Sequence, residues 1–287
     1  MRRFLNIIML MLASTAATPV HHFNITKSFV IALDPLLGSK VAHAAALYFG
    51  LTHMVVFKAI NATEAMAAAE LPLYTQRLIQ LGRNEHMQLG NGAMLGCLMS
   101  HLAVWEQMQE GDIFDVFEED AQFDETSAVR LRTLANDMHS QEWHMVVLEA
   151  GQSLISTGTH NKVGAIAETC APQSNAPCTW YGTRGYILKH TGAKILKKHA
   201  KPFIVQVDAL IGLVAAAFPA DFRLFWTRAD IAYPSNWRRS AVFDWCISCI
   251  FPTVELYEYI LITMLTVNAM SMWLLAARRQ CRQPHVV

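Results

Sequence analysis

The chain has 287 residues, which is enough for one substantial α/β domain or two small ones. Its charge is balanced, with 23 Lys and Arg residues against 23 Asp and Glu residues, so it presents no broad basic field and we expect no nucleic-acid partner. Hydrophobic residues make up 53% and charged residues 16%. This composition is more hydrophobic than is usual for a soluble enzyme and indicates that part of the chain lies in lipid.

The amino terminus predicts a secretory signal peptide. Arg2 and Arg3 give a positive start, residues 4–13 form an apolar run, and small residues follow up to Ala17. We expect cleavage near this point, so that residues 1–17 are the signal. An uncleaved membrane anchor is the alternative.

A βαβ unit is predicted next. Residues 28–33 have the pattern of a buried strand, residues 40–49 that of a helix, and residues 53–59 that of a second strand. This order favours a largely parallel sheet with helices on its faces, that is, a Rossmann-like α/β fold. Residues 61–92 have a more variable pattern, for which we expect a helix and loops.

The centre of the chain predicts a helix, a short strand and then an acidic cluster. Apolar residues recur at helical spacing over residues 92–109, and residues 113–117 form an apolar strand. Glu118, Glu119 and Asp120 follow directly. Ligands bind at the carboxyl ends of the strands in open α/β sheets, so this cluster marks a candidate site.

The remaining elements of the domain are predicted from pattern and composition. They are a helix over 126–139, a strand over 143–148, a long loop and candidate mobile lid over 151–177, a strand or turn over 179–188, and helices over 192–200 and 205–218. Together these elements predict one domain over residues 28–240.

A membrane-spanning helix is predicted near the carboxyl terminus. Residues 259–277 contain no formally charged side chain, and 19 residues at ~1.5 Å rise span a bilayer core of ~30 Å. Arg278 and Arg279 follow at once, which predicts a cytoplasmic tail over 278–287 and a lumenal domain. We assign the span to residues 256–277, with a buried core helix as the alternative.

Two short patterns in the predicted lumenal domain match the acceptor signal for N-glycosylation. Asn24 and Asn61 each begin an Asn-x-Thr triplet, which is the signal for N-glycosylation and also a frequent chance match. We therefore expect a single-pass glycoprotein of the endoplasmic reticulum or Golgi membrane.

The acidic cluster suits a divalent cation. Alternate side chains of an extended segment share a face, so Glu118 and Asp120 can reach one ion while Glu119 points away. Mn²⁺ or Mg²⁺ held there can bridge the two phosphates of a nucleotide-sugar donor and neutralise the charge that develops as the diphosphate leaves. A solvated acidic turn is the alternative.

Two series of residues follow a pattern that is more specific than any of its parts. The first is Gly96-Cys97, Ser100-His101, Trp105 and Glu118-Glu119-Asp120-Ala121, and the second is Gly182-Thr183, Tyr186, Gly192-Ala193, Pro202 and Val207-Asp208. This arrangement resembles glycosyltransferase family 25, which includes lipopolysaccharide and collagen galactosyltransferases. The resemblance covers roughly residues 28–235. Glu119 stands where the family usually has Asp, and Leu33-Asp34-Pro35 lack the Asn and Arg usual there.

The resemblance implies a GT-A-like, Rossmann-like fold and transfer of a hexose, galactose first and glucose second, from a UDP-sugar to a hydroxyl of a glycan, lipid or protein acceptor. It places Ser100 and His101 toward the donor pocket, although by pattern alone His101 is more often a core histidine. Asp34 is a donor-contact candidate by its position only.

The inverting reaction that the resemblance implies needs a base that takes the proton of the acceptor hydroxyl. Asp208 resembles the family's downstream Asp and is the first candidate, with a helix N-cap as its alternative role. Glu149, at the end of a predicted strand, is the second candidate. Tyr186 is expected to pack in the core.

Two other classes of function stay open from the sequence. A catalytically silent, membrane-anchored relative that binds glycans or assists folding is favoured by the departures at Glu119 and after the first strand. A hydrolase with paired carboxylates would need two acids across a cleft, about 5–9 Å apart.

Overall fold

The computed structural model describes residues 23–51, 53–81, 87–150, 167–169, 182–227 and 230–234. The predicted signal peptide (1–17), membrane span (256–277) and tail (278–287) lie outside these ranges, as do the last residues of the predicted domain. Within the described ranges, no helix has the length and apolar character that a bilayer crossing requires.

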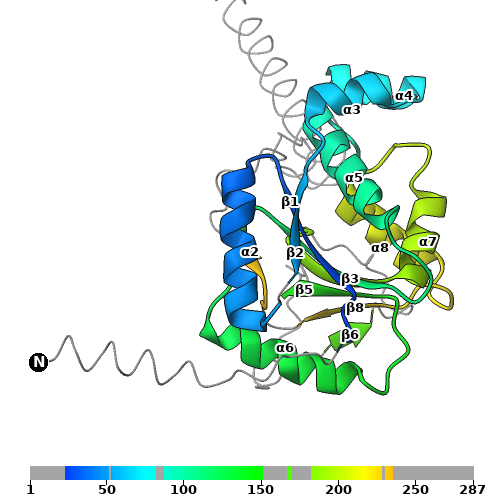
Figure 1. Cartoon of the computed structure of the whole chain (residues 1–287). Coiled ribbons are helices and arrows are strands. Elements are labelled where there is room, and N and C mark those ends of the chain that lie inside the picture. Colours follow the sequence, from blue (N-terminus) through cyan, green and yellow to red (C-terminus); the bar gives the residue numbers. More distant parts are fainter. Residues whose placement is uncertain are drawn as a thin grey trace, which may run out of the picture.

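A seven-stranded sheet forms the centre of the described structure (Figure 1). Its strands, from one edge to the other, are β2 (Met54–Lys58), β1 (Lys27–Ala32), β3 (Ile113–Glu118), β7 (Gly185–Lys189), β5 (Met145–Ala150), β8 (Leu224–Thr227) and β6 (Ala167–Thr169). β1 lies parallel to β2 and β3, and β5 lies parallel to β8. The short strands β4 (Ala121–Gln122) and β9 (Tyr233–Pro234) pair separately.

The sheet is mixed, so the expectation of a largely parallel sheet was wrong in part. β7 runs antiparallel between β3 and β5, and β6 runs antiparallel to β8. A strand that returns antiparallel to its neighbour needs no crossover helix, in keeping with the loop-like composition that precedes β7. β6 falls in the range 151–177, which was predicted as loop throughout; the rest of that range lies outside the described residues.

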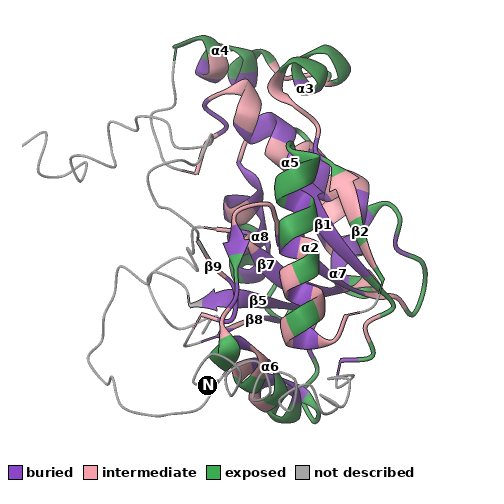
Figure 2. Cartoon of the chain, turned by 60° about the vertical axis from the view of Figure 1, so that its left-hand side comes forward, coloured by how far each residue is buried: buried purple, intermediate pink, exposed green. Residues whose placement is uncertain are grey.

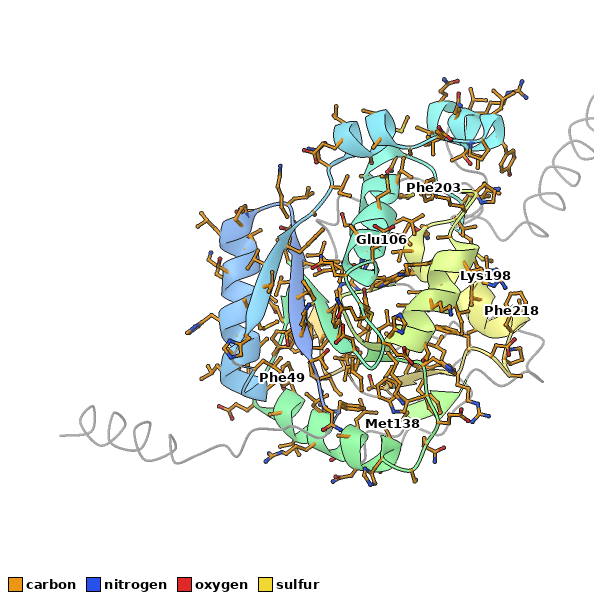
Figure 3. The ribbon with its side chains drawn as sticks, turned by 45° about the vertical axis from the view of Figure 1, so that its right-hand side comes forward. Phe49, Glu106, Met138, Lys198, Phe203 and Phe218 are labelled. Carbon is orange, nitrogen blue, oxygen red and sulfur yellow. The ribbon has the colours of Figure 1, made fainter. Side chains whose placement is uncertain are left out.

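Helices cover both faces of the sheet. α2 (Pro35–Phe49) and α6 (Glu125–Met138) lie on one face, and α5 (Gly92–Trp105), α7 (His190–His199) and α8 (Val207–Ala217) lie on the other. α3 (Ala62–Ala68) and α4 (Leu73–Leu81) extend beyond α5 (Figure 1). Figure 3 shows both layers, with Phe49 and Met138 on one side of the sheet and Phe203 on the other.

The central strands of the sheet are buried on both faces, whereas the edge strand β2 is partly exposed (Figure 2). β1 is buried from Ser28 to Ala32, and the side chains of β3 alternate between the two cores: Phe114 and Val116 pack toward α5, whereas Phe117 packs toward α2. Near-continuous apolar runs are typical of strands covered by helices on both sides. The sheet with helices on both faces therefore confirms the mixed α/β fold expected from the sequence.

α2 begins earlier than predicted. The helix was expected from Lys40, but it starts at Pro35, with Asp34 as its N-cap. The Asp34 carboxylate accepts the Leu36 amide at 2.8 Å, and proline suits the first helical position because its missing N–H has no partner there in any case. Asp34 and Pro35 are thus the start of a helix.

The strand order brings three segments to one edge of the sheet. Since β3 and β5 point the same way and β7 runs opposite between them, the amino end of β7 lies beside the carboxyl ends of β3 and β5. Glu118 ends β3, Glu149 lies near the end of β5, and residues 182–184 precede β7. This edge is where the acidic cluster was expected to bind its ligand.

Candidate active site

Four carboxylates meet the short segment Gly182–Arg184; they are Glu118, Asp120, Glu149 and Asp208. The Gly182 amide hydrogen-bonds Asp208, and the Thr183 hydroxyl donates to Glu118 Oε1. Gly182 has a φ of 130°, and a Cβ there would collide with Glu149 Oε2. Glycine is therefore required at this point by both its backbone conformation and the close approach of the carboxylate.

Arg184 binds the other two acids, Glu149 and Asp120, through three hydrogen bonds. Its backbone amide donates to Glu149 Oε1 at 2.6 Å and its Nη1 to Glu149 Oε2 at 2.7 Å, while its Nε donates to Asp120 Oδ2 at 3.3 Å. Burial raises the pKa of Glu149 to about 8 against the opposing charge of Arg184. Both oxygens of Glu149 are thus engaged by one residue.

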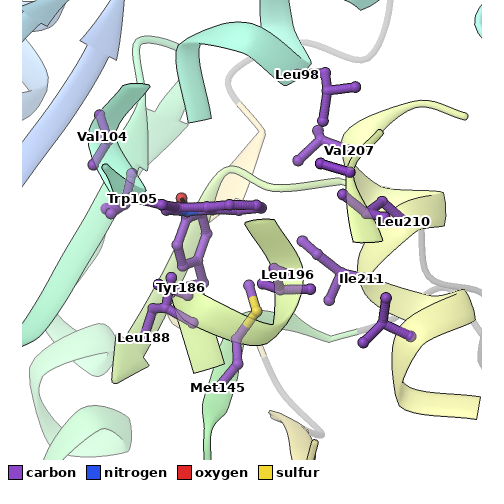
Figure 4. Packing of buried hydrophobic residues seen from close by; sticks show 14 of the residues in the cluster. Leu98, Val104, Trp105, Met145, Tyr186, Leu188, Leu196, Val207, Leu210 and Ile211 are labelled. Atoms are coloured by element: carbon purple, nitrogen blue, oxygen red, sulfur yellow. Dashed lines mark hydrogen bonds between the residues drawn. The ribbon is translucent and has the colours of Figure 1, made fainter. Parts of the chain in front are cut away.

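A chain of hydrogen bonds from buried side chains holds the Glu118 carboxylate. Trp105 Nε1–H donates to the Tyr186 oxygen at 2.8 Å, the Tyr186 oxygen lies 2.8 Å from His101 Nδ1, and His101 Nε2 lies 3.1 Å from Glu118 Oε1. Because Trp105 can only donate, the arrangement that satisfies every group has Tyr186 donating to Nδ1 and a neutral His101 donating from Nε2. Figure 4 shows Trp105 and Tyr186 inside the apolar cluster.

The same chain influences the charge of Glu118. Burial by itself raises the pKa of Glu118, but the hydrogen bond and electrostatic interaction with His101, the hydrogen bond from Thr183 and the charge of Arg184 outweigh it, so the pKa is lowered. His101, Trp105 and Tyr186 have no solvent exposure. His101 is buried, as the alternative of a core histidine predicted. It is also hydrogen-bonded to Glu118, the candidate metal ligand. Tyr186 packs in the core, as expected.

Tyr186→Phe is expected to destabilise the protein by about 1–3 kcal/mol, since it leaves the Trp105 donor and the His101 acceptor buried without a partner. Chemical denaturation measures the loss. The matched control is Tyr74→Phe, because Tyr74 is half exposed on α4 and its hydroxyl accepts an exposed hydrogen bond from Gln88. Equal stabilities for the two variants would show that this chain of hydrogen bonds does not stabilise the protein.

Asp208 lies in the first turn of α8, but it is not the N-cap. Gln206 holds the cap position, so the alternative role considered for Asp208 was wrong. Asp208 Oδ1 accepts the Ala209 amide at 2.8 Å, and burial raises the pKa of Asp208 to about 6 despite the amides of Ala209 and Gly182. A carboxylate with this pKa is ionised at neutral pH and still basic enough to accept a proton.

Ser100 and Asp34 are hydrogen-bonded to groups other than the four carboxylates. Ser100 has no solvent exposure; its hydroxyl accepts the Ile60 amide at 2.8 Å and donates to the Gly96 carbonyl at 2.7 Å. A Cβ on Gly96 would collide with the Ile60 carbonyl, so Gly96 and Ser100 together dock α5 against the end of β2. Asp34 is exposed at the start of α2, and its amide donates to Glu119 Oε2 at 2.9 Å.

The three acids of the cluster point in two directions. Glu118 and Asp120 contact residues 183–184, whereas Glu119 contacts Asp34. Glu118 and Asp120 were assigned to a metal because they were expected to share one face of the strand. Their geometry leaves that assignment available, and Glu119 is engaged elsewhere.

A divalent cation fits the outer part of this site. Asp120 Oδ1 is buried and has no hydrogen-bond partner within the described residues, and the pKa of Asp120 is raised to about 6, first by burial and then by the charge of Glu118. A cation beside Asp120 would satisfy the free oxygen and relieve that repulsion.

The inner part of the site suits a metal less well. Cys97, His101 and Glu118 offer ligand atoms within 4.8 Å of one another. However, both nitrogens of His101 are used by the hydrogen-bond chain, and burial raises the pKa of the Cys97 thiol well above its usual value, so a thiolate is disfavoured. We therefore regard His101 as a hydrogen-bonded support for Glu118, and Cys97 as a residue that packs against the core.

Thr183 and Arg184 were not singled out from the sequence as site residues. Thr183 belongs to the Gly-Thr pair of the second motif series, which was a usable signal. Arg184 stands at a variable position of that pattern, so its role appears only when the antiparallel β7 sets it between Asp120 and Glu149.

Comparison with known sequences bears on the whole arrangement. The family described as glycosyltransferase family 25 (LPS biosynthesis protein) matches residues 43–211, which is more than half of the chain. No curated protein matches. The matched range contains all four carboxylates and the segment Gly182–Arg184, and it leaves out β1 and Asp34.

Proposed function

The chain belongs to glycosyltransferase family 25 and is thus a glycosyltransferase with a sugar donor and an acceptor, and we propose that it transfers a hexose, galactose in preference to glucose, from a UDP-sugar to a hydroxyl of a glycan, lipid or protein. We propose further that the reaction depends on Mn²⁺ or Mg²⁺ held by Glu118 and Asp120, and that the domain has a GT-A-like fold. The sheet with helices on both faces supports the proposed fold.

One observation carries the proposal. Carboxylates from β3, β5 and α8 converge at a single sheet edge, and Asp120 presents a buried oxygen that no described group satisfies. Arg184 is the positive side chain that pairs with these acids in the described structure, so the acids outnumber the opposing charge. Such an excess of carboxylate favours a divalent cation and, through it, the diphosphate of a nucleotide-sugar.

In this proposal, Asp208 and Glu149 have different roles. Asp208 is the base that takes the proton of the acceptor hydroxyl, because one of its oxygens is oriented by the Ala209 amide and its pKa of about 6 suits neutral pH. Glu149, the second candidate, has both oxygens occupied by Arg184 and serves to hold that side chain. A bound cation would neutralise the charge that develops on the departing UDP.

The location of the enzyme is also a proposal. We propose that the predicted signal peptide and the apolar segment at 256–277 place the domain in the lumen of the endoplasmic reticulum or Golgi, with the tail in the cytoplasm. The composition of these segments and the arginines that follow the second one support this arrangement. Protection of the domain from protease in sealed microsomes is the expected result.

Calorimetric titration with UDP-galactose and UDP-glucose, with Mn²⁺ and with a chelator, tests the function. We expect binding and slow UDP release only with the metal, and tighter binding of UDP-galactose. Binding that is equally tight in the chelator would remove the metal from the proposal. A protein that binds neither donor under either condition would contradict the UDP-sugar assignment.

A further inference from the structure

Arg184 lies at the centre of the acidic site. Its side chain is 17% exposed, and its guanidinium reaches two acids from different strands, Asp120 after β3 and Glu149 in β5. Burial alone lowers the pKa of Arg184, but the charges of Glu149, Asp120 and Glu118 outweigh it, so the pKa is raised and the side chain stays charged. The proposed metal site therefore already contains one positive charge of the protein itself.

The two contacts of Arg184 differ in strength. Glu149 is held by two short hydrogen bonds, one from the backbone amide and one from Nη1, whereas Asp120 receives a single longer bond of 3.3 Å from Nε. Asp120 is also more exposed than Glu149, at 34% against 8% of the side chain. The guanidinium can thus leave Asp120 while its anchor on Glu149 persists.

We propose that Arg184 is a built-in counter-ion of the donor site, which neutralises Asp120 until a divalent cation takes over that carboxylate and then turns its guanidinium to the diphosphate of the donor. This inference rests on the proposed function and adds a nucleoside-diphosphate ligand for a residue outside the motif series. A guanidinium suits this second task because its planar fork of N–H donors matches phosphate oxygens.

The proposal requires opposite effects on two ligands. A positive charge beside Asp120 competes with a cation for that carboxylate, so removing it should strengthen the binding of metal alone. The same charge attracts the diphosphate once the metal is in place, so removing it should weaken the binding of UDP. A purely structural role for Arg184 in holding Glu149 and Asp120 would weaken both.

Arg184→Gln is the test, with the full chain titrated calorimetrically at about pH 8. We expect Mn²⁺ alone to bind at least tenfold more tightly than to the unmodified protein, and UDP at saturating Mn²⁺ to bind at least tenfold more weakly. Arg130→Gln is the matched control, because Arg130 donates to the Asp230 carbonyl beside α6 and takes no part in the acidic site. It should change neither constant.

Arg184→Lys keeps the test decisive if the glutamine variant does not fold. Lysine keeps a charge beside Glu149 but lacks a fork that also reaches Asp120, so Mn²⁺ should again bind more tightly and UDP more weakly, each by at least threefold. Weakening of both ligands, or a change in neither, would overturn the counter-ion role. If the unmodified protein binds neither Mn²⁺ nor UDP, the proposed function fails with it, which is a distinct result.

Discussion

Asp120→Asn is expected to lower the rate of UDP release from the donor by at least a hundredfold without unfolding the protein. The substitution keeps the shape of the side chain and removes the charge that the proposed cation needs. Folding should not suffer, because the raised pKa of Asp120 means that its charged form is disfavoured in the folded protein, first by burial and then by Glu118. Initial rates at saturating Mn²⁺ and thermal melts measure the two effects.

Glu119→Gln is the matched control for this prediction. Glu119 lies in the same turn, but its carboxylate accepts the Asp34 amide, and a glutamine oxygen can accept the same bond. We therefore expect an activity within a few-fold of the unmodified protein. Full activity in the Asp120→Asn variant, or an equal loss in both variants, would refute the assignment of the metal to Asp120.

The metal-free protein is expected to lose stability as the pH rises from about 5 to about 8. Burial raises the pKa of Asp120 and Asp208 to about 6, of Asp115 to about 7 and of Glu149 to about 8. A folded-state pKa above the unfolded value gives stability that is complete below the unfolded pKa and is lost as the pH passes the folded pKa. Denaturation in chelator across this range measures the decline.

Asp115 separates this effect from the active site. It lies in the middle of β3 opposite Ser28, is 4% exposed, and has one oxygen without a hydrogen-bond partner within the described residues. Since one pKa unit corresponds to ~1.4 kcal/mol, its ionisation is expected to cost about 2–4 kcal/mol by pH 8. Asp115→Asn should flatten the profile and be more stable than the unmodified protein at high pH.

Mn²⁺ should recover only part of the loss. Binding at Asp120 favours the ionised carboxylate, so the metal is expected to stabilise the protein more at pH 8 than at pH 5, in the unmodified protein and in Asp115→Asn alike. A stability that does not change between these pH values would contradict the raised pKa values of the buried acids. Stabilisation by Mn²⁺ that is independent of pH would place the metal elsewhere.

Periodicity predicted most of the layered fold. The strands that form β1, β2 and β3 and the helices that form α5, α6 and α8 lie within a few residues of their predicted bounds, because each carries a clear apolar pattern. The direction of β7 could not be predicted, since a single apolar run gives no sign of which neighbour it pairs with. The short strand β8 was missed because its burial depends on pairing with β5, far away in the sequence.

The candidate site was predictable where the chemistry is local. Glu118 and Asp120 follow a buried strand, and that position alone indicated a ligand-binding edge. The partners that fix them are remote in sequence: His101 and Thr183 bond to Glu118, and Arg184 bonds to Asp120. These contacts depend on the strand order β3-β7-β5, which only the assembled sheet supplies.

The three consecutive residues Gly182–Arg184 contact all four acids. In a site whose groups are held by separate scaffolds, a local displacement disables one group and spares the others. Here a small shift of the segment would disturb its contacts with Asp208, Glu118, Glu149 and Asp120 together. The four acids of the candidate site therefore share one short contact segment, and substitutions around it should act as one unit instead of adding independently.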